Sequence, residues 1–487
     1  MGKILGNLEP KAVWEYFEEI CKYPHPSKKE TKLANYILGW AKKNQFETYQ
    51  DTTGNIILRK PATKGMENRK PIAIQGHIDM VTEKNNDVKF DFDNDSIQMF
   101  VDGDWVKAKG TTLGADNGIG VSMGMALMSS TNIPHPPLEL LLTVDEETGL
   151  TGAMKIEPGK LQCEILINLD SEEDGTFTIG CAGGQNSSGI YKYKDKEVPA
   201  DSVFYEIDLK GMRGGHSGIE IHDGRANSLK LMTRVLMNLS NKFGIRLSSI
   251  NGGNKHNAIP REAFAVITVP KSKEKAFLGF ISEFDNILKT EYQTKEPGIN
   301  LTAIKSPKPK KVMSKTMQNA LLKSFYAMPH GVIRMSPDMA DLVQTSTNFA
   351  VVETRQKEVY VLTSQRSSVA TEIDDISAMV GYAMELGGAK VTKGDGYPAW
   401  QPNVNSPILQ EAKKIYKRMY NQEPVVQAIH AGLETGLIGE KYPGMDMLSF
   451  GPNLKDVHSP DERVEISTTK KCWELLVEIV KNIPEKK

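Results

Sequence analysis

The 487-residue chain has a normal globular composition, with 39% hydrophobic and 25% charged residues, and is too long for one simple core, so we expect two domains. Sixty basic residues against 61 acidic ones give a net charge of −1, so no overall field recruits nucleic acid or an anionic membrane. No run of the chain approaches the roughly 18 apolar residues that a membrane span needs.

The amino terminus and the cysteines indicate a cytosolic protein. Residues 1–20 lack an apolar stretch followed by a small-residue cleavage site, so no secretory signal is expected. The cysteines show no CxxC spacing, which argues against a disulfide framework and against a thiolate zinc site. We expect them to be buried free thiols; they are Cys21, Cys163, Cys181 and Cys472.

Two helices are expected before the first buried strand. From about Pro10 to Cys21, apolar residues recur at helical spacing. Ser27 followed by Glu30 forms a capping-box pattern, which predicts the start of a second helix. The short apolar run PIAIQ, residues 71–75, is then typical of a buried strand.

This strand leads into GHIDMV, residues 76–81, where His77 and Asp79 stand one residue apart. A ring nitrogen of His77 could bind a metal while Asp79 holds the other nitrogen, an arrangement that fixes the tautomer and angle of a ligand. The pattern is weak by itself. Its meaning depends on further ligands elsewhere in the chain.

A glycine-rich loop supplies the next candidate. In residues 89–109 apolar and polar side chains alternate, which predicts short hairpins with Asp102 and Gly103 as a turn. The many aspartates of this stretch lack the spacing of a calcium-binding loop. The loop GTTLGADNGIG then presents Asp116 at the start of a helix. It matches neither the dinucleotide pattern GxGxxG nor a phosphate-binding loop with its lysine. A carboxylate held at such a turn suits a metal bridge.

Two more strands end in acids. Residues 138–144 form a near-continuous apolar run that Asp145, Glu146 and Glu147 follow, and EILINLD places Asp170 after another apolar strand. Either acidic group alone could be a solvated loop. Together with His77 they fit the rule that α/β sheets bind their ligands at the carboxyl ends of strands.

Five ordered motifs carry a family resemblance over almost the whole chain. The chain resembles the co-catalytic di-zinc peptidases, which include carnosinases, aminoacylases and succinyl-diaminopimelate desuccinylases, and within that family it is most similar to the aminoacyl-histidine dipeptidases. The resemblance implies an α/β catalytic domain with a mixed, mainly parallel sheet flanked by helices, and an inserted α+β lid domain. The motifs are GHIDMV, GTTLGADNGIG, LLTVDEETGLTGA, NLDSEEDG and KDVHSPDERV.

The resemblance implies two zinc ions per chain, with Asp116 bridging them. His77 and Asp170 would complete one site, and Glu147 and His458 the other. These nitrogen and oxygen ligands suit zinc and would also accept cobalt or manganese.

By the same analogy, Glu146 is the general base and Asp79 orients His77. We expect adjacent side chains on extended chain to diverge, so that Glu147 binds metal while Glu146 faces a metal-activated water.

The composition changes after Gly184, and residues 186–394 are expected to form the inserted domain, with 1–185 and 395–487 as the catalytic domain. In the inserted domain the resemblance implies that His216 reaches the oxyanion, from its own chain or from a partner subunit. It also implies that Asn257 binds the substrate carboxylate, for which Arg366 is a second candidate because its guanidinium fork matches a carboxylate.

Near the carboxyl end, we expect a helix from Ser406 to Tyr420 and another from Thr468 to Val480. Between them HAGLETG occupies the place of a substrate loop in relatives, so Gly432 and Glu434 are candidate substrate contacts.

The resemblance therefore implies a cytoplasmic zinc dipeptidase that hydrolyses unblocked dipeptides, with histidine second. The same apparatus leaves two alternatives open: deacylation of N-acyl amino acids, and a catalytically silent peptide-binding protein. Its partner would be a dipeptide substrate, and the resemblance leaves both a monomer and a homodimer open.

Overall fold

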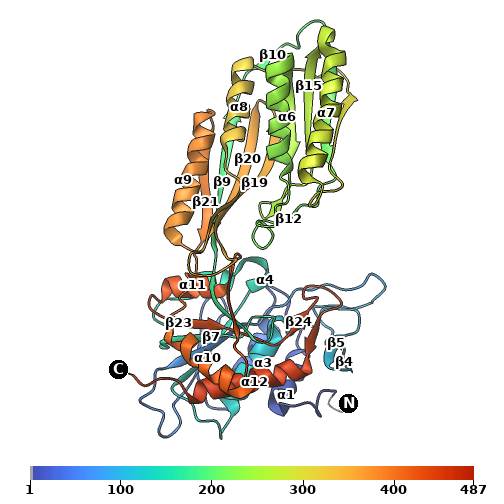
Figure 1. Ribbon diagram of the computed structural model, residues 1–487. Coiled ribbons are helices and arrows are strands. Elements are labelled where there is room, and N and C mark those ends of the chain that lie inside the picture. Colours follow the sequence, from blue (N-terminus) through green and yellow to red (C-terminus); the bar gives the residue numbers. More distant parts are fainter. Residues whose placement is uncertain (1–3, 487) are drawn as a thin grey trace. The chain divides into compact units, whose positions relative to one another are not determined.

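The computed structural model describes residues 4–486, apart from the side chain of residue 395, and divides into two compact units (Figure 1). Unit 1 comprises residues 1–181, 402–428 and 433–487, and unit 2 comprises residues 182–401 and 429–432. The expected boundaries, 185/186 and 394/395, lie close to these. The short return of residues 429–432 to unit 2 was not expected.

Unit 1 is built on a mixed sheet whose central strands are parallel. β3 pairs in parallel with β6 and β7, and β7 pairs in parallel with β23, whereas the pairs β1–β2, β2–β6 and β23–β8 are antiparallel. The strand order is β1 (Glu47–Gln50), β2 (Ile56–Lys60), β6 (Leu138–Thr143), β3 (Ile72–His77), β7 (Ile165–Asn168), β23 (Asp446–Ser449), β8 (Thr176–Cys181) and β22 (Val425–Ile429). The predicted fold class is confirmed for this unit.

Amphipathic helices flank this sheet. α1 buries Val13, Trp14, Phe17 and Ile20, the apolar residues whose spacing predicted it. α3 is buried along almost its whole length, and Gly124 lets it approach the sheet, because a Cβ there would lie 2.4 Å from Leu140 Cδ1. The helices of unit 1 are α1 (Lys11–Ile20), α2 (Thr31–Lys43), α3 (Ala115–Ser129), α4 (Glu146–Gly149), α5 (Thr151–Lys155), α10 (Pro407–Tyr420), α11 (Glu434–Lys441) and α12 (Ile466–Lys481).

Two local predictions in unit 1 were wrong in detail. α2 begins at Thr31 with Glu30 as its N-cap residue, and the Ser27 hydroxyl donates to Asp79 instead of forming a capping box. In the predicted hairpin, Asp102 pairs with Trp105, so Gly103 and Asp104 form the turn. This hairpin, β4 (Met99–Asp102) and β5 (Trp105–Ala108), joins β25 (Arg463–Glu465) and β24 (Leu454–Lys455) in a small second sheet.

Unit 2 contains two βαββαβ repeats in one antiparallel sheet. The sheet order is β16-β11-β15-β13-β19-β20-β9-β21, so each repeat places its fourth strand outermost and its second strand at the centre. The first repeat is β11 (Ser202–Lys210), α6 (Ser228–Phe243), β13 (Arg246–Gly252), β15 (Ala263–Pro270), α7 (Glu274–Tyr292) and β16 (Asn300–Lys305). The second is β9 (Gly183–Lys192), α8 (Lys315–Ala327), β19 (Val343–Arg355), β20 (Glu358–Ser367), α9 (Ala370–Leu386) and β21 (Lys390–Tyr397).

The first repeat is inserted between β9 and α8 of the second, and one core of apolar side chains runs through both. Asn227 caps α6 by accepting hydrogen bonds from Leu229 and Lys230 N–H. The short elements are β10 (Asp195–Lys196), β12 (Gly215–His216), β14 (Ala258–Ile259), η1 (Lys271–Lys273), β17 (Val312–Met313) and β18 (Gly331–Met335). None of the helices within residues 4–486 combines the length and apolar character that crossing a bilayer requires.

Candidate functional site

The carboxyl ends of three neighbouring strands gather the first candidate ligands in unit 1. His77 is the last residue of β3 and pairs with Thr143, the last residue of β6. Gln75 of β3 pairs with Asn168 at the end of β7, so Asp170, two residues further, emerges level with His77. Parallel pairing therefore brings together residues that are far apart in the sequence.

There are three groups of three side chains, and within each group the ligand atoms lie within 4.8 Å of one another. The groups overlap, because each of His77, Asp116 and Glu147 belongs to two of them. The groups are His77, Asp116 and Asp170; Asp116, Glu147 and His458; and His77, Glu146 and Glu147. The first two contain the five predicted metal ligands, which the fold thus brings to one place.

Asp116 lies between the two histidines. Its Oδ1 is 3.1 Å from His77 Nε2 and its Oδ2 is 3.3 Å from His458 Nε2. His458 Nε2 also lies 3.0 Å from the Glu147 carboxylate, and His77 Nε2 lies 3.5 Å from Asp170 Oδ1. One carboxylate thus spans two positions, each with a histidine and a second acid, as a metal-bridging ligand would.

Asp79 holds the other side of His77. The Nδ1 atom of His77 lies 3.1 Å from the Asp79 carbonyl oxygen and 3.3 Å from its carboxylate. The same carboxylate accepts hydrogen bonds from the backbone N–H groups of Glu146 and Glu147, at 3.0 and 3.1 Å. Asp79 therefore orients the histidine and also fixes the turn that carries the two glutamates.

Glu146 and Glu147 begin the short helix α4 and do not lie on extended chain as expected. Asp145, just before them, has a left-handed backbone with φ 51°. Adjacent side chains still diverge, because successive residues of a helix are rotated by about 100°. Glu147 contacts His458, whereas Glu146 forms no ion pair within residues 4–486.

The site carries more negative charge than its two histidines balance. Burial raises the pKa of Asp170 to about 8 and outweighs the opposing effect of His77, and repulsion from Asp116 and Glu434 adds to the rise. Burial also raises the pKa of Glu146 well above its ordinary value. Hydrogen bonds to Asp116 and Glu147 raise the pKa of His458 to about 11.

Two opposite shifts show how tightly the groups interact. Burial would raise the pKa of Asp116, but its hydrogen bonds to His458 and His77 hold that pKa well below its ordinary value. Burial would lower the pKa of His77, but Asp170 and Asp116 raise it well above its ordinary value. Within the described part of the chain, only histidines form ion pairs with these buried acids.

The donor set fits divalent cations. The Asp170 Oδ1 atom is buried without a hydrogen-bond partner, an arrangement that is costly unless a ligand or ion completes it. Two imidazoles and several carboxylates are ligands that zinc, cobalt and manganese accept. The surplus of buried carboxylates provides the charge that such ions would neutralise.

A buried polar network lies beneath this site. The Glu434 carboxylate at the start of α11 accepts hydrogen bonds from Gln75 and Thr143, at 2.6 and 2.7 Å, while its Oε1 has no partner. Asn168 donates to Gln75 at 2.6 Å. Glu434 was expected to contact substrate. It is 1% exposed, and burial raises its pKa to about 7.

Sequence reasoning missed Glu462, whose buried carboxylate accepts hydrogen bonds from the Asp116 loop. Its only sequence signal is its place in HSPDERV, four residues after His458.

Unit 2 gathers a second set of polar residues around Arg366 of β20. Its side chain is buried, its Nε has no hydrogen-bond partner, and its Nη1 donates to the Tyr397 hydroxyl at 3.0 Å. Arg366 lies in a small cavity of about 170 Å³ that Gly184, Gln185, Asn186, His256, Ser364 and Tyr397 complete. Among the side chains that the structure describes, which exclude that of residue 395, Arg366 forms no salt bridge, so no described carboxylate pairs with this buried cation.

The Tyr397 ring packs where two glycines leave room for it. A Cβ at Gly184 would lie 2.6 Å from the ring, and a Cβ at Gly432 would lie 2.7 Å from it. Gly432, a predicted substrate contact, thus supports the tyrosine that contacts Arg366. Tyr397 itself was missed because a tyrosine in GDGYPAW carries no pattern of its own.

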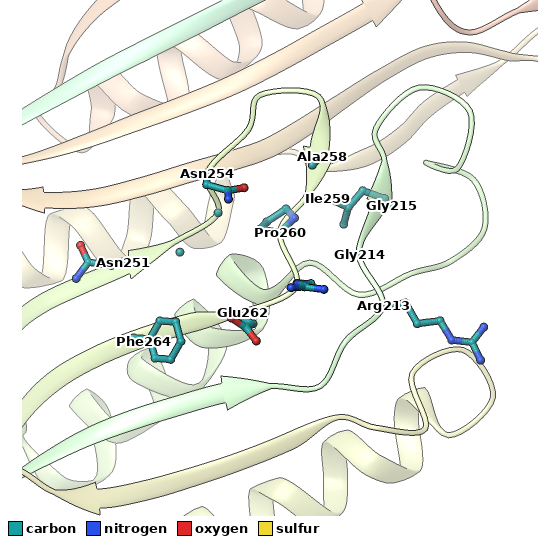
Figure 2. Close-up of a pocket in the computed structure, with 13 residues that line it drawn as sticks. Arg213, Gly214, Gly215, Asn251, Asn254, Ala258, Ile259, Pro260, Glu262 and Phe264 are labelled. Carbon is teal, nitrogen blue, oxygen red and sulfur yellow. The ribbon is translucent and has the colours of Figure 1, made fainter. Parts of the chain in front are cut away.

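The two other predicted residues of unit 2 lie on a short ribbon. His216 of β12 pairs with Ala258 of β14, and Ser217 N–H donates to the Asn257 carbonyl at 2.9 Å. Burial and the charge of Arg366 lower the pKa of His216. A hollow of about 510 Å³ lies beside this ribbon. Gly214, Ala258 and Pro260 are among the residues that line it (Figure 2), and none of the predicted site residues does.

Comparisons with known proteins agree with this geometry. Residues 73–482 match the model of peptidase family M20/M25/M40. A cytosol non-specific dipeptidase of Escherichia coli is 43% identical over 99% of both chains. The crystal structure of aminoacylhistidine dipeptidase from Vibrio alginolyticus is 41% identical, with a TM-score of 0.95 over 99% of both chains.

An aminopeptidase PepT from Bacillus cereus is 14% identical, with a TM-score of 0.57, and covers 98% of this chain and 99% of its own; it shares the fold alone. The predicted family resemblance is therefore confirmed: this chain belongs to peptidase family M20/M25/M40.

Proposed function

We propose that this chain is a metal-dependent dipeptidase that hydrolyses short unblocked dipeptides, with those of the Xaa-His type as its preferred class. The observation that carries the proposal is the convergence of the five candidate ligands and Glu146 in unit 1. The names of the Escherichia coli and Vibrio alginolyticus relatives support the substrate class.

We propose two zinc ions as the metals, with cobalt or manganese as substitutes. Asp116 would bridge them, His77 and Asp170 would complete one position, and Glu147 and His458 the other. When bound, such ions lower the pKa of a water and polarise the scissile carbonyl.

Glu146 would act as general base. Its carboxylate would take a proton from the attacking water and return that proton to the leaving nitrogen. Two features support this role: Glu146 forms no ion pair within residues 4–486, and burial raises its pKa toward the range in which a base works. Asp79, through its two backbone hydrogen bonds to the glutamate turn, would keep Glu146 in place.

The candidate substrate contacts are those that the family resemblance implies. The guanidinium of Arg366, whose Nε has no hydrogen-bond partner, is suited to the terminal carboxylate, with Asn257 and Gly432 as further contacts. The unpartnered Oε1 of Glu434 is suited to the amino end. His216 would donate to the oxyanion.

Cytosolic location is part of the proposal, supported by the name of the Escherichia coli relative. Size-exclusion chromatography with light scattering measures the oligomeric state. A monomer would require His216 to act in its own chain, whereas a dimer would also allow it to act in a partner.

One assay separates the activities. Zinc-loaded protein is incubated with carnosine, Leu-Gly and N-acetyl amino acids, with a chelated sample as control. We expect hydrolysis of the dipeptides, fastest with histidine second, and loss of hydrolysis after chelation. Hydrolysis of the N-acetyl substrates alone would identify a deacylase, and binding without any hydrolysis a silent peptide-binding protein.

A further inference from the structure

Glu462 places its carboxylate under the loop that carries Asp116. The side chain is buried, with 3% of its surface exposed. Both oxygens accept backbone hydrogen bonds, and the four donors are consecutive in the chain. They are Leu113 (2.7 Å) and Gly114 (3.0 Å) to Oε2, and Ala115 (2.8 Å) and Asp116 (3.3 Å) to Oε1.

This loop needs such a partner because its backbone is not helical where α3 begins. Gly114 has a left-handed backbone with φ 73°, and Asp116 has φ −85° and ψ 107°. The first N–H groups of a helix have no partner within the helix, and buried N–H groups without partners are costly. Without the Glu462 carboxylate, the Asp116 backbone would lose the contacts that set its direction.

Glu462 also lies in the turn that follows His458. Glu462 follows His458 by four residues, and its N–H donates to the Ser459 carbonyl at 3.1 Å, which closes a tight turn. β25 starts directly after it and pairs with β5. The turn that presents His458 and the loop that presents Asp116 are therefore joined by one carboxylate.

We propose that Glu462 is a positioning residue that holds Asp116 and His458 as one preformed ligand pair, so that binding of the metal ions depends on its carboxylate. This inference rests on the proposed metal site. Asp79 has the corresponding role for the other loop, since it accepts the backbone N–H groups of Glu146 and Glu147. Glu462 touches neither metal position itself.

Glu462→Gln tests the inference. The amide keeps the size of the side chain but has one accepting oxygen, and its NH₂ group meets backbone donors. We expect zinc affinity to fall roughly 10- to 100-fold, the usual effect of removing a partner that orients a ligand. Zinc per chain is measured by equilibrium dialysis and atomic absorption, with unfolding temperature measured in parallel on metal-free protein.

Glu139→Gln is the matched control. Glu139 is also 3% exposed and accepts the backbone N–H groups of Gln162 and Cys163, at 2.8 and 3.0 Å. It lies near the start of β6, at the opposite end from the ligands. We expect this variant to lose stability and to keep wild-type zinc affinity.

The outcomes separate the two proposals. Wild-type protein that binds no zinc would overturn the proposed metal site. Wild-type zinc affinity in Glu462→Gln, or an equal loss in Glu139→Gln, would overturn the role of Glu462 alone. If Glu462→Gln does not fold, Glu462→Asp replaces it: the charge stays but the carboxylate withdraws by one methylene, and an intermediate affinity is expected. An Asp variant with unchanged affinity would also overturn the role.

Discussion

The two units bury opposite charges. In unit 1, carboxylates outnumber the two histidines that pair with them, and Asp170 keeps an oxygen without a hydrogen bond. In unit 2, Arg366 is buried and its Nε has no hydrogen-bond partner. Burial is the main cause of the lowered pKa values of His216 and His256, and the charge of Arg366 is the second cause. Among the described side chains, unit 1 therefore lacks cations to balance its carboxylates, and unit 2 lacks an anion to balance Arg366.

This difference indicates a division of labour. Divalent ions would balance unit 1 and supply the chemistry, whereas a carboxylate would balance Arg366 and is present in every unblocked dipeptide. Substitutions in unit 1 should therefore act on turnover or metal content, and substitutions around Arg366 on substrate binding. Three predictions test this contrast.

The largest effect is expected for Glu146→Gln. The amide cannot take the proton of the attacking water, so kcat should fall roughly 10²- to 10⁴-fold, the usual contribution of a general base. Zinc content should stay at the wild-type value, because Glu146 is not among the five proposed ligands. Steady-state kinetics and atomic absorption on the same sample measure both quantities.

Glu173→Gln is the control for this substitution. It removes an exposed carboxylate from the acidic stretch that follows Asp170, and both kcat and zinc content should be unchanged. Wild-type kcat in Glu146→Gln with full zinc would show that another group moves the proton.

The second effect is expected for Arg366→Lys. Lysine keeps the charge but loses the planar fork that matches a carboxylate, so kcat/KM should fall roughly ten- to 100-fold, mainly through a higher KM. Zinc content should not change. Arg246→Lys is the matched control: Arg246 is a partly buried arginine of β13 whose Nε also has no hydrogen bond, and its Nη2 donates to the Met313 carbonyl.

Dipeptide amides, which lack the terminal carboxylate, test directly whether Arg366 recognises that group. A substrate whose carboxylate is amidated should react poorly with the wild type and lose little more with Arg366→Lys. If the variant instead loses kcat equally for both substrates at unchanged KM, the division between chemistry and recognition is wrong.

How much could be predicted differs between the units for a physical reason. In unit 1, an apolar strand followed at once by an acid or a histidine is visible in the sequence, and this pattern nominated His77, Asp170 and the three acids Asp145, Glu146 and Glu147. The glycine-rich loop nominated Asp116. The choice of Glu147, the ligand His458 and the fold class needed the family resemblance, because no local pattern distinguishes them.

The supporting contacts could not be predicted. Glu462 meets the Asp116 N–H across 346 residues, and Glu434 meets Gln75 across 359. Such contacts depend on which loops the tertiary structure brings together, and no local sequence pattern predicts these loop pairs. The failed capping box has the same cause: the Ser27 hydroxyl finds the Asp79 carboxylate, 52 residues away, in place of a helix N-terminus.

The smallest effect concerns the pH dependence of stability in metal-free protein. Burial raises the pKa of Asp170 to about 8 and that of Glu434 to about 7, and hydrogen bonds raise that of His458 to about 11. Between about pH 7 and about pH 8 these groups bind more protons in the folded chain than in the unfolded chain, so stability falls as pH rises through this range. The lowered pKa values of Asp79 and Asp116, and those of buried histidines such as His330 and His430, change stability only in more acidic solution.

Zinc should reverse this slope, because its ligands bind in deprotonated form and the stabilisation by metal grows as protons leave. Unfolding temperatures at about pH 7 and about pH 8, with chelator or with zinc, measure both slopes. Asp170→Asn removes one of the raised carboxyl groups, so the metal-free slope should become shallower. If metal-free protein became more stable from about pH 7 to about pH 8, the acids of unit 1 would already be balanced by the chain itself, and the contrast between the units would fail.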